Sequence, residues 1–318
     1  MKKIALLSTS VALSSVSMLS CVDLDSFVMN PKHCSVGYSD DDCEKKKLCS
    51  ACDEVYPFAE FGLPADTATR HPIPLADGLT NDAWFFPSNG GPLAGTTIVF
   101  SHGNFGSLEH YLNRAGRLWQ LGANVFAVDY RGFGQSEDTR EASEPVFMDD
   151  ADRAFDLVES VLAEHGLDPS QPIALYGYSA GALSATQMAI HAQDRICALV
   201  LEAPWPSADA FAADSSFIGV PGSFVATGTW DNVTKLRDHH KPYLQLHGDE
   251  DFTVRIELGR EVFAAVDSGD KALVVVEGAA HGNYLGVASD PGVLRDVAAV
   301  LGDAYGETLR AFLRDRCR

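Results

Sequence analysis

The sequence predicts an α/β protein with a doubly wound, mostly parallel sheet flanked by helices, and two observations support this prediction. Short segments that are apolar throughout recur along the chain, as expected for strands buried on both faces. Segments with the apolar spacing of helices separate them, and this alternation implies right-handed crossovers between parallel strands. The expected strands cover residues 96–103, 124–132, 172–179, 197–204, 242–248 and 271–278.

The clearest expected helix covers residues 148–166, where acidic residues come first, apolar residues fall on one face and a glycine ends the segment. A terminal helix is expected over residues 293–315. A long insert without periodicity covers residues 204–240. Loops of this length in a compact domain are usually functional, so the sequence predicts a short lid insertion there.

The composition is that of a soluble protein with a large core. Of the 318 residues 46% are hydrophobic, and 24 basic against 44 acidic residues give a net charge of −20. Nucleic-acid binding requires clustered Lys and Arg, so this charge argues against a nucleic-acid partner.

The first 20 residues have the character of an export signal and not of the folded domain. Two lysines precede a modest apolar stretch that is too short and too rich in serine for a membrane span. The following "MLSC" resembles a bacterial lipoprotein box in which Cys21 becomes lipidated, although Met18 and Leu19 depart from that pattern. The prediction is an exported protein of the bacterial cell envelope, periplasmic or anchored in a membrane through Cys21. Ordinary cleavage nearby is the alternative.

The cysteines suit an oxidising compartment. The chain has seven, and six remain when Cys21 is set aside for a lipid. Cys197 and Cys317 are expected to pair across the main domain, residues 56–318, and the others to form two bridges in a small extension, residues 21–55. A zinc site is the alternative for these four residues, which are Cys34, Cys43, Cys49 and Cys52.

Residues 177–181 read Gly-Tyr-Ser-Ala-Gly between an expected strand and an expected helix. In that context G-x-S-x-G forms a nucleophile elbow, a tight turn that strains the serine backbone and raises its hydroxyl above the sheet. Side chains in place of Gly177 and Gly181 would collide with the neighbouring strand and helix. Ser179 is therefore the predicted nucleophile, and its place at a helix N-terminus favours developing negative charge.

A serine hydroxyl needs a base to remove its proton. His281 is the best placed of the ten histidines, because it lies shortly after the last expected strand. His102 and His247 also end strands, but each precedes a glycine and is expected to be structural or to line the site. His239 and His240 fall in the insert and are expected to be exposed.

The base in turn needs a carboxylate that fixes its tautomer. Asp249, Glu250 and Asp251 follow the penultimate strand, which gives the chain order serine, acid, histidine expected for such a fold. Spacing alone does not choose among the three. Glu202 is a fourth candidate, but we expect it to be a carboxylate on the rim of the site and not the triad acid.

Two backbone N–H groups are expected to bind the oxyanion of the reaction. One belongs to Ala180, directly after the nucleophile, and the other to Asn104 in the loop after the first long strand, with Phe105 as the next choice. No metal or organic cofactor is needed for this chemistry.

With these residues identified, the chain resembles an α/β-hydrolase over residues 82–316. Within that superfamily it is similar to the bud-emergence type of serine hydrolases, which includes acyl hydrolases and depalmitoylating thioesterases. The resemblance implies that Asp251 is the triad acid, that Ser179 and His281 are nucleophile and base, and that Asn104 and Ala180 supply the oxyanion donors. The blocks that resemble it are "SHGNFGSLEHYLNRAGRL", "NVFAVDYRGFGQSE" and "LHGDEDFTV".

Three departures separate the chain from the family pattern. Ala182 follows the elbow where glycine is commoner, Arg255 stands where a proline is often found after the acid, and the cysteine-rich extension is not part of the pattern. These differences leave the predicted triad intact and bear on the subfamily.

The leading hypothesis is an exported serine hydrolase that acts on small-molecule carboxylic esters or thioesters. A serine peptidase acting on short peptides is the second, because related folds cleave such peptides. It would need a group that recognises a peptide N-terminus, and three acidic residues of the insert leave this open: Asp209, Asp214 and Asp231. A surface lipoprotein that uses the fold only for binding is the third. Aromatic residues of the insert either line an acyl pocket or pack the insert onto the domain; they are Trp205, Phe211, Phe217, Phe224 and Trp230.

Overall fold

The computed structural model describes residues 28–29, 33–34, 54–104, 106–137, 142–214, 228–281 and 298–318. The predicted export signal, residues 1–20, lies outside the described residues. So do the following residues named above: Cys21, Cys43, Cys49, Cys52, Phe105, Phe217 and Phe224.

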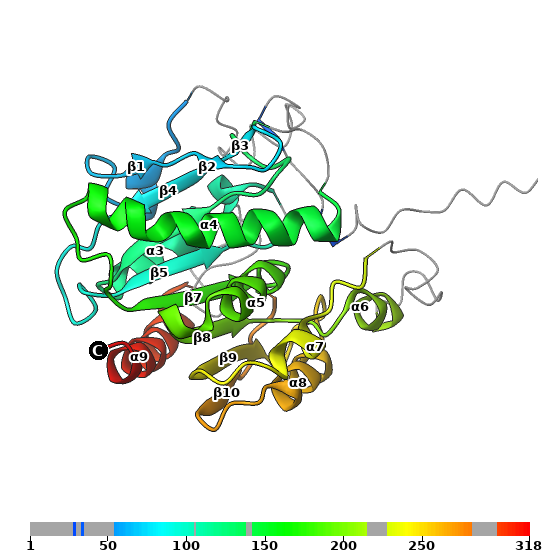
Figure 1. Cartoon of the computed structure of the whole chain (residues 1–318). Helices are drawn as coiled ribbons and strands as arrows, with labels where there is room; N and C mark the ends of the chain where they lie inside the picture. The colour runs from blue at the N-terminus through cyan, green and yellow to red at the C-terminus, as the bar shows by residue number, and fades with distance from the viewer. Residues whose placement is uncertain are drawn as a thin grey trace, which may run out of the picture.

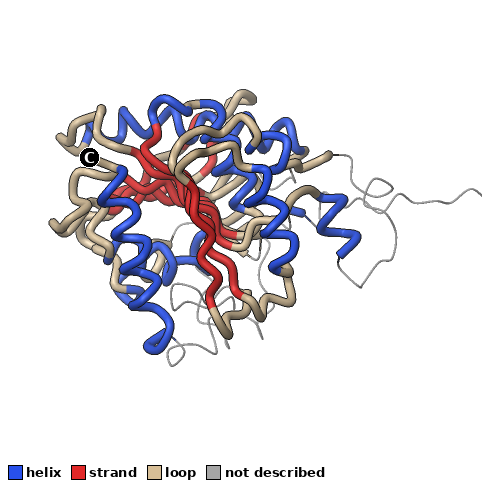
Figure 2. The backbone as a smooth tube through the Cα atoms, turned by 90° about the horizontal axis from the view of Figure 1, so that it is seen from below, coloured by secondary structure: helices blue, strands red, loops and turns tan. Residues whose placement is uncertain are grey.

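A twisted eight-stranded sheet runs through the middle of the molecule, with helices on both faces (Figures 1 and 2). All neighbouring strands from β6 to β10 pair in parallel, and only β1 and β4 are antiparallel to their neighbours. The chain adds strands to both sides of β5, which confirms the predicted doubly wound, mostly parallel sheet. The spatial order is β1 (Thr69–Arg70), β4 (Ala83–Phe86), β6 (Asn124–Val128), β5 (Thr97–Ser101), β7 (Ile173–Tyr178), β8 (Ile196–Glu202), β9 (Tyr243–Gly248) and β10 (Lys271–Val276).

The central strands are apolar throughout because both of their faces are covered. Every residue of β5, β6, β7 and β9 is buried, whereas the edge strand β10 is only partly covered. A separate pair of short strands, β2 (Ile73–Pro74) and β3 (Thr80–Asn81), lies outside the main sheet. The described residues also form three 3₁₀ turns: η1 (Phe58–Phe61), η2 (Leu108–Tyr111) and η3 (Gln193–Arg195).

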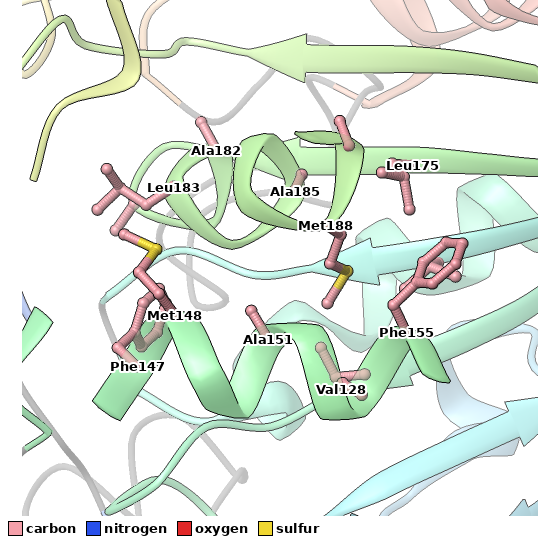
Figure 3. Close-up of a cluster of buried hydrophobic side chains, with 14 of the residues drawn as sticks. Val128, Phe147, Met148, Ala151, Phe155, Leu175, Ala182, Leu183, Ala185 and Met188 are labelled. Carbon is pink, nitrogen blue, oxygen red and sulfur yellow. The ribbon is translucent and has the colours of Figure 1, made fainter. Parts of the chain in front are cut away.

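The helices α4 (Glu144–Glu164) and α5 (Gly181–His191) cover one face of the sheet, together with α8 (Ile256–Ala265). Figure 3 shows side chains of α4 and α5 meeting over this face, with Met148, Phe155 and Met188 among them. The expected helix at 148–166 begins four residues earlier than predicted, because a proline in its first turn fits a helix start.

The opposite face of the sheet packs against α3 (Leu112–Gln120) and the C-terminal α9 (Ala298–Arg316). A disulfide joins Cys197 at the start of β8 to Cys317 just after α9, as the sequence predicts. The α9 helix is therefore fixed covalently to the sheet.

Two short pieces of the cysteine-rich extension lie against the main domain. Val28 and Met29 are buried in the same hydrophobic cluster as the α4–α5 face. The backbone N–H of Cys34 donates to the carbonyl of Gly134 at 2.8 Å. Cys34 is itself disulfide-bonded, which favours the bridge interpretation over zinc for this residue.

The described parts of the insert between β8 and β9 include two short helices, α6 (Ala208–Asp214) and α7 (Asn232–Leu236). The α7 helix packs against α5 and α8, so this end of the insert is built into the domain. For that reason the prediction that His239 is exposed is wrong: its side chain is fully buried against Tyr243, while that of His240 is largely exposed.

The aromatic residues described in the insert pack it onto the domain. Trp205 is buried and stacks on Phe211 with ring centroids 5.4 Å apart. Trp230 is fully buried and meets Phe147 of α4 edge-on. Of the two alternatives for the insert aromatics, these three residues therefore pack the insert onto the domain.

Candidate active site

The turn between β7 and α5 has the geometry of a strained elbow. Ser179 has φ of +54°, in the left-handed region that residues other than glycine rarely adopt. Its backbone N–H donates to the carbonyl of Glu202 at 2.8 Å. A Cβ on Gly181 would collide with the backbone oxygen of Ser101, and one on Gly177 would lie 2.6 Å from the oxygen of Gly181. Both glycines are required for the reason predicted from the sequence.

Three side chains from separate loops meet at this elbow. The Nε2 atom of His281 lies 3.1 Å from the hydroxyl oxygen of Ser179, and its Nδ1 lies 2.7 Å from a carboxylate oxygen of Asp251. The second carboxylate oxygen of Asp251 accepts the backbone N–H groups of Thr253 and Val254 at 2.9 and 2.8 Å. Asp251 is thus fixed before it orients the histidine.

The other candidate acids lie elsewhere. Asp249 is exposed and accepts the backbone N–H of Gly278 at 2.7 Å, and Glu250 is also exposed. Glu202 is not the rim carboxylate that was expected, because it is completely buried at the end of a central strand. There it accepts two hydrogen bonds from Arg114, each 2.9 Å long.

The remaining strand-end histidines are built into the framework. Both ring nitrogens of His102 lie against oxygen acceptors, Nε2 at 2.8 Å from Asp129 and Nδ1 at 2.6 Å from the carbonyl of Gly103. The Nε2 of His247 lies 2.8 Å from the carbonyl of Val254, and burial lowers the pKa of this histidine. Both therefore hold loops of the site in place.

The loop that carries Asn104 is tied to residues that follow β6. Asp129 bonds to His102 and also accepts the backbone N–H of Leu108 at 3.3 Å, while the hydroxyl of Tyr130 donates to the carbonyl of His102 at 2.7 Å. The side-chain amide of Asn104 donates to the carbonyl of Val28 at 3.0 Å, so the extension also reaches this loop. Oxyanion binding by the backbone of Asn104 and Ala180 stays a prediction.

Sequence reasoning missed the buried cation Arg114 and the buried carboxylate Asp129. Arg114 and its partner Glu202 are separated by 88 positions, and no motif links them. The helix around Arg114 also holds Asn113, Arg117 and Gln120, so the sequence gives no signal that this one arginine is buried and paired.

Within the described ranges, no group of three or more His, Cys, Asp or Glu residues is arranged to hold a metal ion. No helix in the described part of the chain combines the length and the apolar character that crossing a membrane requires.

Comparisons with known proteins agree with this architecture. Residues 94–220 match the family model described as serine aminopeptidase, S33, a stretch that contains Ser179. The protein bem46 of Schizosaccharomyces pombe is 31% identical over 178 residues, which cover 55% of this chain and 58% of bem46. The α/β hydrolase domain-containing protein aho-3 of Caenorhabditis elegans is 30% identical over 225 residues, which cover 68% of this chain and 57% of aho-3.

The solved structure of the Pyrococcus furiosus esterase Pf2001 has the same fold. It superposes with a TM-score of 0.62 at 20% identity, covering 83% of this chain and 97% of the esterase. The chain therefore has the α/β-hydrolase fold. Within that superfamily it is similar to bem46 and the related hydrolase-domain proteins, of which it spans somewhat more than half the length.

Proposed function

We propose that this protein is an exported serine hydrolase that cleaves carboxylic ester or thioester bonds. The observation that supports this most directly is the continuous chain of contacts from Asp251 through His281 to the hydroxyl of Ser179. The acid holds Nδ1 of the imidazole, so that Nε2 is left to accept the serine proton. The similarity to an esterase of the same fold is consistent with this chemistry.

The reaction proceeds in two steps that share one base. Ser179 passes its proton to Nε2 of His281 while its oxygen attacks the substrate carbonyl, and the carbonyl electron pair moves onto the oxygen. The tetrahedral intermediate collapses and expels the alcohol or thiol, which takes the proton from His281 and leaves an acyl group on Ser179. A water molecule then gives a proton to His281 and attacks the acyl carbonyl. The carboxylic acid leaves and Ser179 regains its proton.

The oxyanion of each tetrahedral intermediate lies between two backbone donors, those of Ala180 and Asn104. Ala180 precedes the first residue of α5, so the positive end of that helix adds to the stabilisation. A single oxyanion-hole donor typically contributes about 3–4 kcal/mol of transition-state stabilisation.

A peptidase acting on short peptides is the second candidate, because the matching family model is described as serine aminopeptidase. Such an enzyme needs a negative group that binds the substrate ammonium. Two of the three acidic residues considered for this are engaged within the protein: Asp214 pairs with Arg255, and Asp231 caps α7 by accepting the N–H of Thr234. The peptide candidate therefore depends on Asp209, the exposed one of the three.

The proposal is tested with nitrophenyl esters from acetate to palmitate and with a fluorophosphonate probe. We expect ester turnover and labelling of Ser179, and we expect Ser179→Ala to lower kcat by about 10⁶-fold at unchanged fold, since the nucleophile of a triad has an effect of this size. Near-wild-type turnover in Ser179→Ala would exclude the mechanism. Labelling without ester turnover would direct attention to peptides, and a folded protein that does not label would support a binding module.

We propose in addition that the chain is exported to the bacterial cell envelope and anchored through a lipid on Cys21. The lysine-led apolar start and the cysteine that follows it support this. Fractionation of bacterial cells that express the full chain tests it: the protein is expected in the membrane fraction, and Cys21→Ala is expected to release it into the soluble periplasm. An unchanged membrane fraction in Cys21→Ala would overturn the lipid anchor.

A further inference from the structure

A fully buried ion pair lies directly behind the elbow. Arg114 of α3 donates from Nε and one terminal nitrogen to the two carboxylate oxygens of Glu202, each at 2.9 Å. Both side chains are completely shielded from solvent. Burial alone would lower the pKa of Arg114, but Glu202 raises it above the ordinary value, so the guanidinium stays charged.

Glu202 contacts the nucleophile strand in two ways. Its backbone carbonyl accepts the N–H of Ser179 at 2.8 Å, and its carboxylate accepts a hydrogen bond from the hydroxyl of Tyr176. The residue after it, Ala203, has φ of +48°, so the end of β8 is also held in a strained conformation. The position of Glu202 is therefore coupled to the strained backbone of Ser179.

Arg114 contacts the residue that precedes the nucleophile. Its guanidinium carbon lies 3.7 Å from the ring centroid of Tyr178. The ring of Tyr178 is in turn 5.2 Å, centroid to centroid, from the imidazole of His281. On the side of the oxyanion loop, a Cβ on Gly103 would come within 3.1 Å of the same ring. Tyr178 thus lies between the base and the loop of Asn104.

We infer that the Arg114–Glu202 pair positions the catalytic groups, holding Ser179 through the backbone of Glu202 and holding His281 and the oxyanion loop through the ring of Tyr178. This role rests on the proposed function, because it assigns to the pair the alignment of that same nucleophile and base. The inference extends the proposed function to Arg114 and Glu202, two residues that touch neither the substrate nor the reacting atoms.

A purely stabilising role is a weaker explanation of the pair. Removing two charges from water is costly, and well-packed apolar residues of similar volume often serve stability as well or better. Here the pair also contacts the catalytic groups. Glu202 accepts the N–H of Ser179, and Arg114 packs on the Tyr178 ring that lies beside His281. Alignment of these groups, unlike stability, depends on the forked geometry of arginine.

The test uses three variants. Arg114→Lys keeps the charge but loses the forked guanidinium, and Glu202→Gln keeps the shape but loses the charge. Tyr178→Leu removes the aromatic ring. We expect each to lower kcat of the folded enzyme by about 10²-fold with little change in KM, since a misalignment of about 1 Å has an effect of this size. The rate at which a fluorophosphonate labels Ser179 is expected to fall with kcat. Circular dichroism reports the folded fraction, and the two other variants test the role if Glu202→Gln does not fold.

The matched control is the buried pair of Arg131 and Asp150, in which two hydrogen bonds of 2.9 and 3.1 Å join the side chains on the α4 side of the sheet. Arg131→Lys and Asp150→Asn are expected to reduce thermal stability while kcat stays close to the wild-type value. Equal kcat and labelling rates in the Arg114, Glu202 and Tyr178 variants and in the wild type would overturn the positioning role. A wild-type protein that neither labels nor hydrolyses would instead overturn the proposed function.

Discussion

Two histidine–aspartate pairs follow strands of the same sheet, and they differ in what the second ring nitrogen meets. In the pair of His102 and Asp129, the other nitrogen of the imidazole lies against the carbonyl of Gly103, and the whole pair is shielded from solvent. In the pair of His281 and Asp251, the other nitrogen faces the hydroxyl of Ser179, and the imidazole keeps 12% of its surface exposed.

The difference shows that a carboxylate beside a histidine does not by itself make a base. The His102 ring has oxygen atoms of the protein against both nitrogens, which suits a residue that holds a loop. The His281 ring has an acceptor on one side and a hydroxyl on the other, which suits a residue that takes a proton. Chemistry therefore depends on the partner of the second nitrogen and on access for substrate.

Replacing each histidine in turn gives the largest effect expected from this comparison. His281→Ala is expected to lower kcat by about 10⁶-fold and to leave stability almost unchanged, because it removes the proposed base. His102→Ala is expected to lower kcat by at most about 10³-fold, the upper end of the effect of one lost oxyanion donor, and mainly to reduce stability. Initial rates on a nitrophenyl ester and thermal unfolding of both variants measure the contrast.

The two aspartates supply a milder version of the same experiment. Asp251→Asn is expected to lower kcat by about 10⁴-fold through the wrong histidine tautomer. Asp129→Asn keeps the shape of the pair in the framework and is expected to act mainly on stability. If Asp129→Asn or His102→Ala reduced kcat of the folded protein as strongly as the changes at Asp251 and His281, the two pairs would have the same role.

The elements nearest to the elbow could be predicted from the sequence because their causes are local. Buried strands are apolar throughout, and the glycines at 177 and 181 are required by contacts with their immediate surroundings. The meeting of Ser179 and His281 followed from the order of strand ends in a doubly wound sheet.

What could not be predicted depends on contacts between distant parts of the chain. Glu202 looks like a rim residue until Arg114 reaches it from α3, 88 positions away. The burial of His239 arises because α7 packs against α5 and α8, and an insert without periodicity gives no sign of that packing. The choice of Asp251 over Asp249 likewise depended on the family resemblance, because spacing leaves both open.

His239 extends the comparison to a third histidine, one that is buried with no carboxylate partner in the described part of the chain. Burial, aided by the nearby His240, lowers its pKa from 6.5 to about 4. The unfolded chain therefore takes up a proton between pH 6.5 and 4 that the folded protein does not, and stability falls as the pH is lowered through this range. At about 1.4 kcal/mol for each pH unit, the loss attributable to His239 is roughly 3 kcal/mol.

The free energy of unfolding measured against pH in wild type and His239→Gln isolates this contribution. Asp82 acts in the opposite direction over the same range. Burial raises its pKa to about 6, so the contribution of Asp82 to stability is lost as the pH rises. Asp82 is present in both proteins, so its contribution cancels when the two curves are subtracted. The variant is expected to lose less stability on acidification than the wild type. His240→Gln removes only the smaller contribution of the exposed neighbour, so its curve is expected to stay closer to that of the wild type than the curve of His239→Gln does. Parallel curves for wild type and His239→Gln would show that burial without a carboxylate does not keep this histidine neutral. The contrast among the three histidines would then depend on hydrogen-bond partners alone.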